Sequence, residues 1–270
     1  MRKAGSKVVL LAIAIATAAP AGAQEPGTDK AAELAKKLAN PVASLISVPL
    51  QYNYDQHYGA DDKGSKSLLN IQPVWPFSLG ENWNLITRTI VPVVSQKDIP
   101  PGTDKSGLGD IMQSFFFSPK QPVSGWTLAV GPVILYPAAS SKVLGGGKWG
   151  AGPTGLALKQ SNGWTVGLLV NHVVSFAGKS DRADISSTFL QPFLSYITKS
   201  KTTFGFNTES TYDWKNKQWA VPLNLSVSQL QKAGKLPVQV GAGIRYWADS
   251  PDNGPADIGF RAVVTFLFPK

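Results

Sequence analysis

Few residues in this sequence have the chemistry of a catalytic centre. The 270 residues include no cysteine and two histidines, His57 and His172. His172 follows Asn171 and precedes Ser175, and Asp184 comes soon after, so a hydrolytic arrangement can be drawn from these residues. However, the chain has no nucleophile-elbow motif around a serine, and His57 lies in a polar segment. We therefore predict no catalytic residues and keep an enzyme based on His172 as an alternative.

The sequence also lacks recognisable patterns for metals, phosphates and cofactors. Gly145–Lys148 has neither the four-residue spacer nor the Ser or Thr of a phosphate-binding loop. Without cysteine, no disulfide, zinc–thiolate or iron–sulfur site can form. Eight aspartates in predicted loops do not have calcium-loop spacing, namely Asp61, Asp62, Asp98, Asp104, Asp181, Asp184, Asp249 and Asp252. We predict no metal and no cofactor.

A further set of residues points to selection of solutes by charge. These residues fall on the polar faces of predicted strands: Arg88, Asp110, Glu209, Asp213, Arg245, Asp257 and Arg261. We interpret them as lining the lumen of a membrane barrel, because an arginine that faced lipid at the midplane would cost about 2 to 4 kcal/mol. Two roles remain open. Either the arginines form a positive stripe that selects anions, or they pair with Asp110, Glu209 and Asp257 and brace a narrow lumen.

The elements that would position these residues have a period of two. In residues 46–54 every second residue is apolar or aromatic, which predicts a strand with one apolar face. The same alternation recurs in residues 219–228, 238–246 and 257–268. Further strands are predicted at residues 68–77, 83–95, 108–118, 126–136, 148–159, 164–176, 186–198 and 202–214. The sequence therefore predicts about twelve strands.

The connections between these strands alternate in length. Short turns at residues 78–82, 119–124, 161–163, 199–201 and 231–235 alternate with longer polar loops at 56–67, 96–107, 138–147, 177–185 and 248–256. This pattern is typical of an outer-membrane barrel. A soluble β-sandwich or lipocalin-like barrel is the alternative. It is disfavoured because the polar faces carry few charges and because aromatic residues cluster at strand ends, as in interfacial girdles. The predicted fold is all-β, a transmembrane antiparallel β-barrel with a short N-terminal helix.

Residues 1–23 have the three regions of a secretory signal peptide. Basic residues precede the apolar stretch Val8–Ala16, and Ala21–Ala23 forms a small-residue cleavage site before Gln24. Removal of this segment lowers the formal net charge of +9. The remaining basic residues are scattered and form no stripe of the kind that binds nucleic acid, so we exclude that partner. After the leader no apolar run reaches about 18 residues, which excludes a helical membrane protein.

Residues 24–43 are predicted to form a periplasmic arm, and residues 44–270 the barrel. A short helix is expected over residues 29–39, ending at Asn40-Pro41. It either packs on the barrel as part of the arm or enters the pore as a plug. The prolines inside predicted strands indicate bulges or rim positions, because proline donates no ladder hydrogen bond. They are Pro49, Pro73, Pro92, Pro132, Pro153, Pro192, Pro222 and Pro237.

Several motifs together resemble a known family. They are Gly107–Ile111, Lys148–Pro153, Val170–His172, Ser175–Gly178 with Arg182 and Asp184, Thr188–Phe193 and Phe266–Lys270. They resemble a bacterial outer-membrane β-barrel transporter family of the meta-pathway phenol-degradation type, whose members sometimes carry the misapplied label neuromedin U. The likeness covers most of the mature chain. It implies an outer-membrane location and passage of small hydrophobic or aromatic molecules, and it brings no catalytic residues.

We expect an outer-membrane channel or passive transporter for a small molecule of hydrophobic or aromatic character. Its expected partners are outer-membrane lipids, the solute and the barrel-assembly machinery, and both termini are expected in the periplasm. Two other hypotheses remain: an outer-membrane enzyme that modifies lipid through His172, and a structural or adhesive barrel without transport.

Overall fold

The computed structural model of the chain describes residues 27–234 and 236–268. The predicted signal peptide lies outside the described residues. The described chain consists of helix α1 (Gly27–Leu38) and the strands β1 (Ile46–Tyr58), β2 (Gly64–Ile71), β3 (Val74–Leu79), β4 (Trp83–Lys97), β5 (Lys105–Leu108), β6 (Ile111–Pro119), β7 (Trp126–Tyr136), β8 (Lys148–Ser161), β9 (Trp164–Gly178), β10 (Ser186–Ile197), β11 (Thr202–Thr208), β12 (Ser210–Asp213), β13 (Gln218–Ala233), β14 (Leu236–Asp249) and β15 (Ile258–Phe268).

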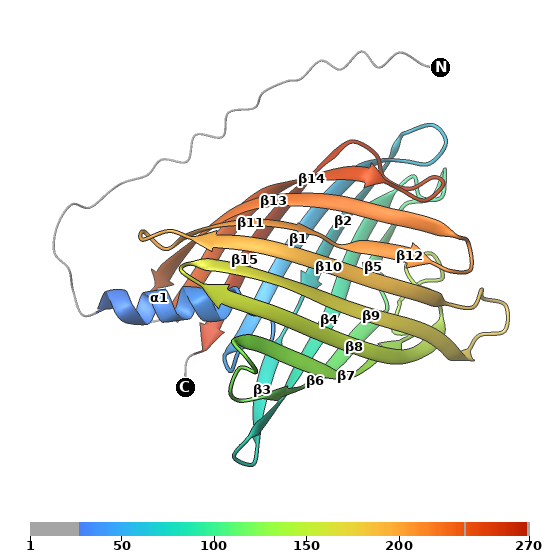
Figure 1. The fold of residues 1–270 in the computed structure, drawn as a ribbon. Coiled ribbons are helices and arrows are strands. Elements are labelled where there is room, and N and C mark those ends of the chain that lie inside the picture. The colour runs from blue at the N-terminus through green and yellow to red at the C-terminus, as the bar shows by residue number, and fades with distance from the viewer. Residues whose placement is uncertain (1–26, 235, 269–270) are drawn as a thin grey trace.

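These segments form one closed antiparallel barrel (Figure 1). Each strand pairs with its neighbour in sequence, and β15 pairs with β1 to close the wall. The prediction of a twelve-stranded antiparallel barrel with a short helix is confirmed. Closure pairs the strands on both sides through the middle of the wall, as a sheet in lipid requires. Only near the two ends, at β5 and most of β3, does a described segment pair with β4 alone.

Three of the twelve barrel strands are interrupted, which explains why the structure has more strand segments than barrel strands. β2 and β3 form one strand broken at Gln72-Pro73, β5 and β6 one strand broken at Gly109-Asp110, and β11 and β12 one strand broken at Glu209. Proline cannot donate to a ladder, which accounts for the first break. Pro222 likewise lies at a register shift between β13 and β14. Pro73 and Pro222 therefore mark irregular positions, whereas Pro49, Pro132, Pro153 and Pro192 lie in regular register, where no bulge accompanies them.

The two ends of the barrel differ in their connections. One end, here the short-turn end, carries the turns at residues 80–82, 120–125, 162–163 and 198–201 and the connection between β13 and β14. The other, the long-loop end, carries residues 59–63, 98–104, 137–147, 179–185, 214–217 and 250–257. The connection at 214–217 is as tight as the turns of the opposite end.

The outward face of the wall is apolar and bounded by aromatic side chains. Phe204, Leu225 and Ile244 alternate along their strands with inward residues and are about half exposed. Aromatic pairs gather at both ends: Trp164 packs on Tyr196 at the short-turn end, and Tyr212 packs on Trp214 at the long-loop end. This arrangement is typical of a barrel surrounded by lipid.

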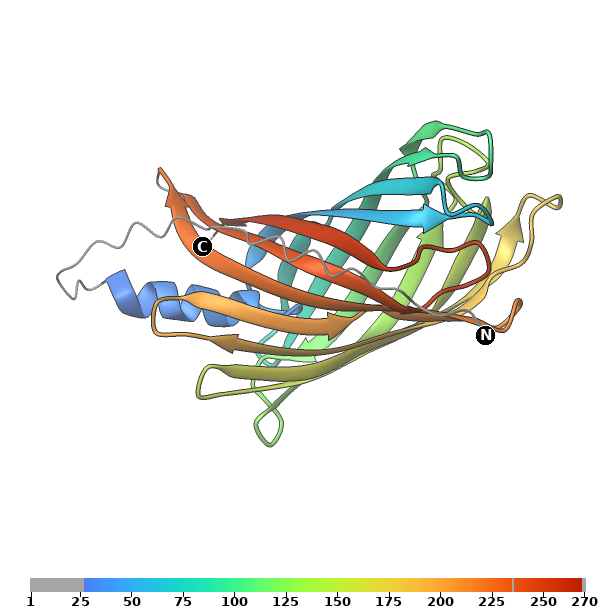
Figure 2. The same cartoon turned by 90° about the horizontal axis from the view of Figure 1, so that it is seen from above.

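Helix α1 lies at the short-turn end (Figure 1 and Figure 2). Its Ala35 is buried, and the Gln160 side chain of β8 donates a hydrogen bond to the Lys36 carbonyl at 2.9 Å. Among the described residues, no helix is long and apolar enough to cross a membrane. After the helix the chain turns at Asn40, whose side-chain oxygen accepts the Val42 N–H at 3.0 Å. The arm is therefore docked on the barrel at this end.

The short-turn half of the barrel is filled by an apolar layer. Val42 from the arm packs there with inward-facing residues of the wall, which are Val74, Ile86, Phe116, Ala129, Leu156, Leu158 and Leu169, flanked by Phe189 and Phe193. A second apolar cluster joins Ala43 and Leu45 to Leu267, with Leu34 and Leu38 of α1 against it. Because these inward positions are apolar, the interior at this end is packed along β3 to β9. A hollow of about 210 Å³ remains between the arm and β10 to β14, where Gln191, Ser195 and Gln239 are among the polar lining residues.

Candidate channel lumen

A cavity of about 300 Å³ lies inside the barrel beyond the apolar layer. Polar side chains line it on both sides: Gln51, Asn70, Gln72, Arg88 and Ser114 from β1 to β6, and Asn171, Ser187, Gln191, Glu209 and Thr211 from β9 to β12. Leu135, Leu169, Val173 and Phe189 lie among its apolar lining. Arg88 lies two residues after Ile86 of the apolar layer, on the same face of β4. The cavity therefore begins where the packed core ends.

Two arginines meet a single carboxylate beside this cavity. The Glu209 Oε2 atom accepts a hydrogen bond from Arg261 Nη2 at 2.6 Å and one from Arg245 Nη1 at 3.4 Å. Arg245 Nε also donates to Asp55 at 3.0 Å. Asn53 Oδ1 accepts from both guanidiniums, at 2.7 Å from Arg261 and 3.1 Å from Arg245. These charges are buried and paired, which is how ionised groups are held away from bulk water.

Strand parity places Glu209 in this network. Thr208 ends β11 and Ser210 begins β12, and their hydroxyl groups are 2.6 Å apart. The register with β10 and with β13 is the same before and after Glu209, so its side chain points inward like that of Thr211. From there it reaches arginines on β14 and β15, two and three barrel strands away.

Arg88 is placed differently from the other two arginines. Its Nη2 donates to the Gln72 side-chain oxygen at 2.6 Å. Within residues 27–234 and 236–268, no carboxylate oxygen lies within salt-bridge distance of this guanidinium. Gln72 lies at the interruption between β2 and β3, where the register with β1 and β4 does not change, so its side chain faces inward like that of Asn70.

Asp110 lies at the third strand interruption and holds a loop of the long-loop end. Its carboxylate accepts the backbone N–H groups of Ala139 at 3.1 Å and Gly146 at 2.6 Å. Arg182 from the next loop donates to the carbonyls of Gly145 and Gly146 at 2.6 and 3.1 Å. The loop of residues 137–147 is thus fixed by side chains from two sides. The bracing hypothesis required Asp110 to pair with an arginine of the lumen. The structure shows no such pair among the described residues.

Asp213 and Asp257 lie at the rim of the long-loop end. Asp213 accepts the backbone N–H of Lys215 at 2.8 Å and caps the turn that follows β12. Asp257 lies 3.1 Å from His57 and has a φ of 61° just before β15 begins. Strand parity predicts both aspartates inside the barrel. Asp213 is the last residue of β12, and its carboxylate binds the turn that follows, whereas Asp257 precedes β15 and lies outside the regular strand. Neither aspartate pairs with a lumen arginine.

The residues around His172 do not form a hydrolytic triad. The His172 Nδ1 atom lies 2.8 Å from the Thr188 hydroxyl, which also accepts the Trp214 indole N–H at 2.8 Å. Ser175 instead lies 3.4 Å from Asp184 and accepts the Ile185 N–H. Lys148, 3.1 Å away, lowers the pKa of the exposed Asp184 carboxyl below its usual value by hydrogen bonding and charge attraction. In the described part of the chain, His172 therefore has a threonine partner and no acid.

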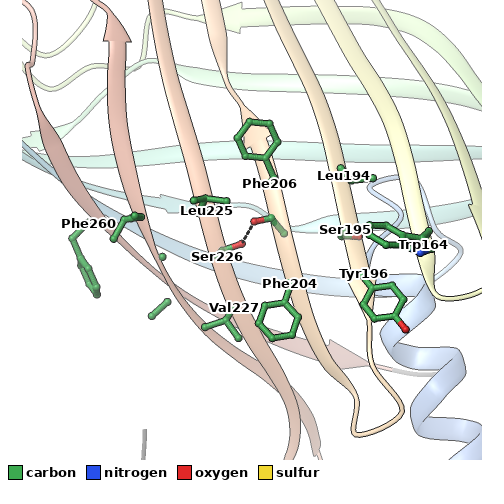
Figure 3. Close-up of a pocket in the computed structure, with 14 residues that line it drawn as sticks. Trp164, Leu194, Ser195, Tyr196, Phe204, Phe206, Leu225, Ser226, Val227 and Phe260 are labelled. Carbon is green, nitrogen blue, oxygen red and sulfur yellow. Dashed lines mark hydrogen bonds between the residues drawn. The ribbon is translucent and has the colours of Figure 1, made fainter. Parts of the chain in front are cut away.

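A second, larger hollow of about 700 Å³ lies on the outward face of the wall (Figure 3). It crosses β10, β11, β13 and β14, and Phe204, Phe206 and Leu225 project around it. Since its side chains are almost all apolar, it offers a surface for hydrocarbon and no charged group that would orient a solute.

The chain shares its fold with solved outer-membrane channels. The COG4313 outer membrane channel from Pseudomonas putida F1 superposes with a TM-score of 0.65 at 14% identity, covering 83% of this chain and 96% of that one. The NanC porin superposes with a TM-score of 0.51 at 10% identity, covering 83% of this chain and 100% of that one. An outer membrane phospholipase from Salmonella typhi gives 0.50 at 11% identity, over 86% and 94%. No protein-family model and no curated protein matches the sequence. At these identities the likeness is one of fold.

Three partners in the lumen were not among the predicted residues: Asn53, Asp55 and Gln72. The sequence places Asn53 on the polar face of the first strand, but neutral residues were not considered as partners. Asp55 follows the predicted end of that strand, and β1 continues to Tyr58, so the same parity would have included it. Gln72 adjoins Pro73, and the strand break there carries a recognisable signal in the proline.

Proposed function

We propose that this protein is an outer-membrane channel or passive transporter for a small molecule with a hydrophobic or aromatic part. The observation that carries the proposal is a partly polar cavity inside a closed barrel whose outward surface is apolar. The motifs that resemble the phenol-degradation-type transporter family support the same solute class, and we propose membership of that family.

The proposed location is the outer membrane, with the short-turn end and both termini in the periplasm. Short periplasmic turns and longer external loops are the usual arrangement of such barrels. The docking of α1 at the short-turn end supports this orientation. The proposed partners are outer-membrane lipids, the solute and the barrel-assembly machinery, and residues 1–23 are proposed to be removed on export.

Passage through the lumen requires a movement at the short-turn end. Val42 of the arm completes the apolar layer, and Ala35 and Leu45 are also buried there. We propose that the arm moves away from the barrel to open this end, because the arm enters the layer from outside the wall and is not paired as a strand.

The proposal is tested by conductance in planar bilayers and by solute uptake into liposomes. Refolded protein, verified by its heat-dependent mobility on gels, should produce discrete current steps and admit small solutes. A folded barrel that gives neither current nor uptake would overturn the channel function and favour a structural or adhesive barrel.

We also propose that the protein has no lipid-hydrolysing activity. His172→Ala should leave solute uptake within about twofold of the wild type, because the histidine contacts a threonine on the outward face and no carboxylate. His57→Ala, at the rim, is the matched control. Phospholipid hydrolysis by the wild type that is lost in His172→Ala and kept in His57→Ala would favour the enzyme.

A further inference from the structure

We propose that the lumen cavity binds an amphipathic organic anion, with Arg88 holding the anionic group and the opposite wall holding an apolar body. This inference rests on the proposed channel function and names the class of its solute. It follows from the difference between Arg88 and the other lumen arginines, from the balance of charge around the cavity and from the composition of its walls.

Arg88 has donor groups to spare. A guanidinium carries five N–H donors in a planar fork, and the hydrogen bond of Arg88 in the described structure uses one of them, on Nη2, for the neutral Gln72. Arg245 and Arg261, by contrast, are engaged by Asp55, Asn53 and Glu209. Arg88 lines the cavity. A carboxylate or sulfonate is the group that this fork binds best, through two parallel hydrogen bonds.

The positive charges around the cavity outnumber the negative ones. Arg88, Arg245, Arg261 and, outside the cavity lining, Lys66 face two carboxylates, Asp55 and Glu209. Glu209 also lines the cavity, but its Oε2 atom is directed to Arg261 and Arg245. Of the positive groups in the described structure, Arg88 is the one that lines the cavity, and it makes no ion pair with a carboxylate. An inward charge without a counterion is unfavourable in a confined space, and a bound anion would neutralise it.

The cavity also offers apolar contacts on the side away from β1 and β2. Leu169 and Val173 lie on β9 and Phe189 on β10, where they alternate with the polar Asn171, Ser187 and Gln191. In the strand order these two strands lie half-way round the barrel from β1 and β2, which carry Gln51 and Asn70. Apolar side chains that can hold a ring are thus available across the cavity, beside polar groups. An apolar cavity of about 150 Å³ can hold a benzene molecule, so a volume of about 300 Å³ has room for one ring and an anionic group.

The proposed site therefore distinguishes solutes by two features at once. A neutral solute of the same shape cannot compensate the Arg88 charge, and a small inorganic or short-chain anion does not fill the apolar wall. A ligand that has both features gains from burial of its apolar body and from charge-assisted hydrogen bonds.

The test measures binding of three probes to refolded protein in detergent by calorimetry at pH 7.5. Benzoate has both features, benzamide is its neutral analogue, and acetate lacks the ring. The wild type should bind benzoate at least about tenfold more tightly than either of the others, since one good charge-assisted contact is worth about a factor of ten. Equal affinity for benzoate and benzamide would overturn the proposal.

Two variants with the same charge change locate the site. Arg88→Gln should weaken benzoate binding about tenfold and abolish the preference over benzamide. Lys66→Gln removes another inward charge, on β2 opposite Asp55 and outside the cavity lining, and should leave benzoate affinity within about twofold. If both variants weaken binding equally, a general lumen charge is responsible and the role of Arg88 is refuted.

Arg88→Lys keeps the positive charge and loses the planar guanidinium. It keeps the proposal testable if Arg88→Gln does not fold. It should keep a reduced preference for benzoate over benzamide, whereas a preference identical to the wild type would contradict the two-point contact. Conductance of the same preparations separates the two proposals. Current without benzoate preference refutes the anion site alone, and absence of current refutes the channel.

Discussion

Glu209 is the residue on which the buried charge network of the lumen depends. One oxygen of its carboxylate accepts hydrogen bonds from two guanidiniums that belong to neighbouring strands, β14 and β15. It thereby ties the interrupted strand β11–β12 to the strands that close the barrel. Removal of one partner from a buried pair leaves the other charge uncompensated, which costs more than the pair itself contributes.

Glu209→Gln should therefore lower the free energy of unfolding by about 3 kcal/mol. The glutamine keeps the shape of the side chain but leaves Arg261 and Arg245 with Asp55 as their remaining carboxylate. The measurement is urea-induced unfolding in detergent, followed by tryptophan fluorescence. Glu81→Gln, the same change in the exposed turn after β3, is the control and should stay within about 0.5 kcal/mol. Equal losses in both variants would refute the bracing role.

For individual residues, the sequence predicts which positions carry inward charges better than it predicts which groups these charges pair with. Arg245 and Arg261 face inward by strand parity, and that period is visible in the sequence. Asp257 and Asp110 lie where the strand is interrupted or has not begun, so parity gave the wrong surroundings for them. Of the two roles considered, pairing describes Arg245 and Arg261 with Glu209, while Arg88 keeps the donor capacity that a selective site requires.

Each strand interruption adjoins one polar side chain of the interior or the loops: Gln72 contacts Arg88, Glu209 contacts two arginines, and Asp110 holds the loop of residues 137–147. The register with the neighbouring strands changes only at the break beside Asp110, so Gln72 and Glu209 face inward by regular alternation. The number of barrel strands could be predicted from period and turn spacing. Two of the interruptions could not, because Gly109 and Glu209 carry no local signal as strong as a proline.

Asp110→Ala should release the loop of residues 137–147. The variant removes the acceptor of two backbone N–H groups, and loss of a hydrogen bond to a charged group costs about 2 kcal/mol. The open form of the loop should become about thirtyfold more populated. Trypsin reports this, because Lys142 lies in the loop and offers a cleavage site.

Cleavage after Lys142, followed by mass spectrometry at low trypsin concentration, should accelerate by a similar factor in this variant. Asp62→Ala changes an exposed aspartate of another loop at the same end and should not alter the rate. Unchanged cleavage in Asp110→Ala would mean that Arg182 and the Lys142–Asp181 contact hold the loop without it.

At the scale of the whole molecule, the barrel has a cavity in its middle and a closure at its short-turn end. The closure consists of inward apolar side chains and the arm, which packs there by apolar contact and a few hydrogen bonds. The sequence predicted a short helix in the arm but left open whether it lies on the barrel or in the pore. The structure places α1 at the end of the barrel and Val42 in its interior. The contribution of Val42 follows from tertiary packing and has no signature in the local pattern.

Ala35→Asp should open this closure. Ala35 lies on the side of α1 that faces the barrel and is 1% exposed. An unpaired carboxylate buried at this position costs several kcal/mol. When the arm undocks, the carboxylate regains its hydration and the barrel strands stay paired. Current through planar bilayers should therefore increase, while heat-dependent mobility on gels stays that of a folded barrel. Lys36→Asp introduces the same group at the exposed neighbouring position and should conduct like the wild type. If Ala35→Asp conducts no more than Lys36→Asp, the arm does not limit passage, and the solute must pass the apolar layer by a rearrangement of the wall itself.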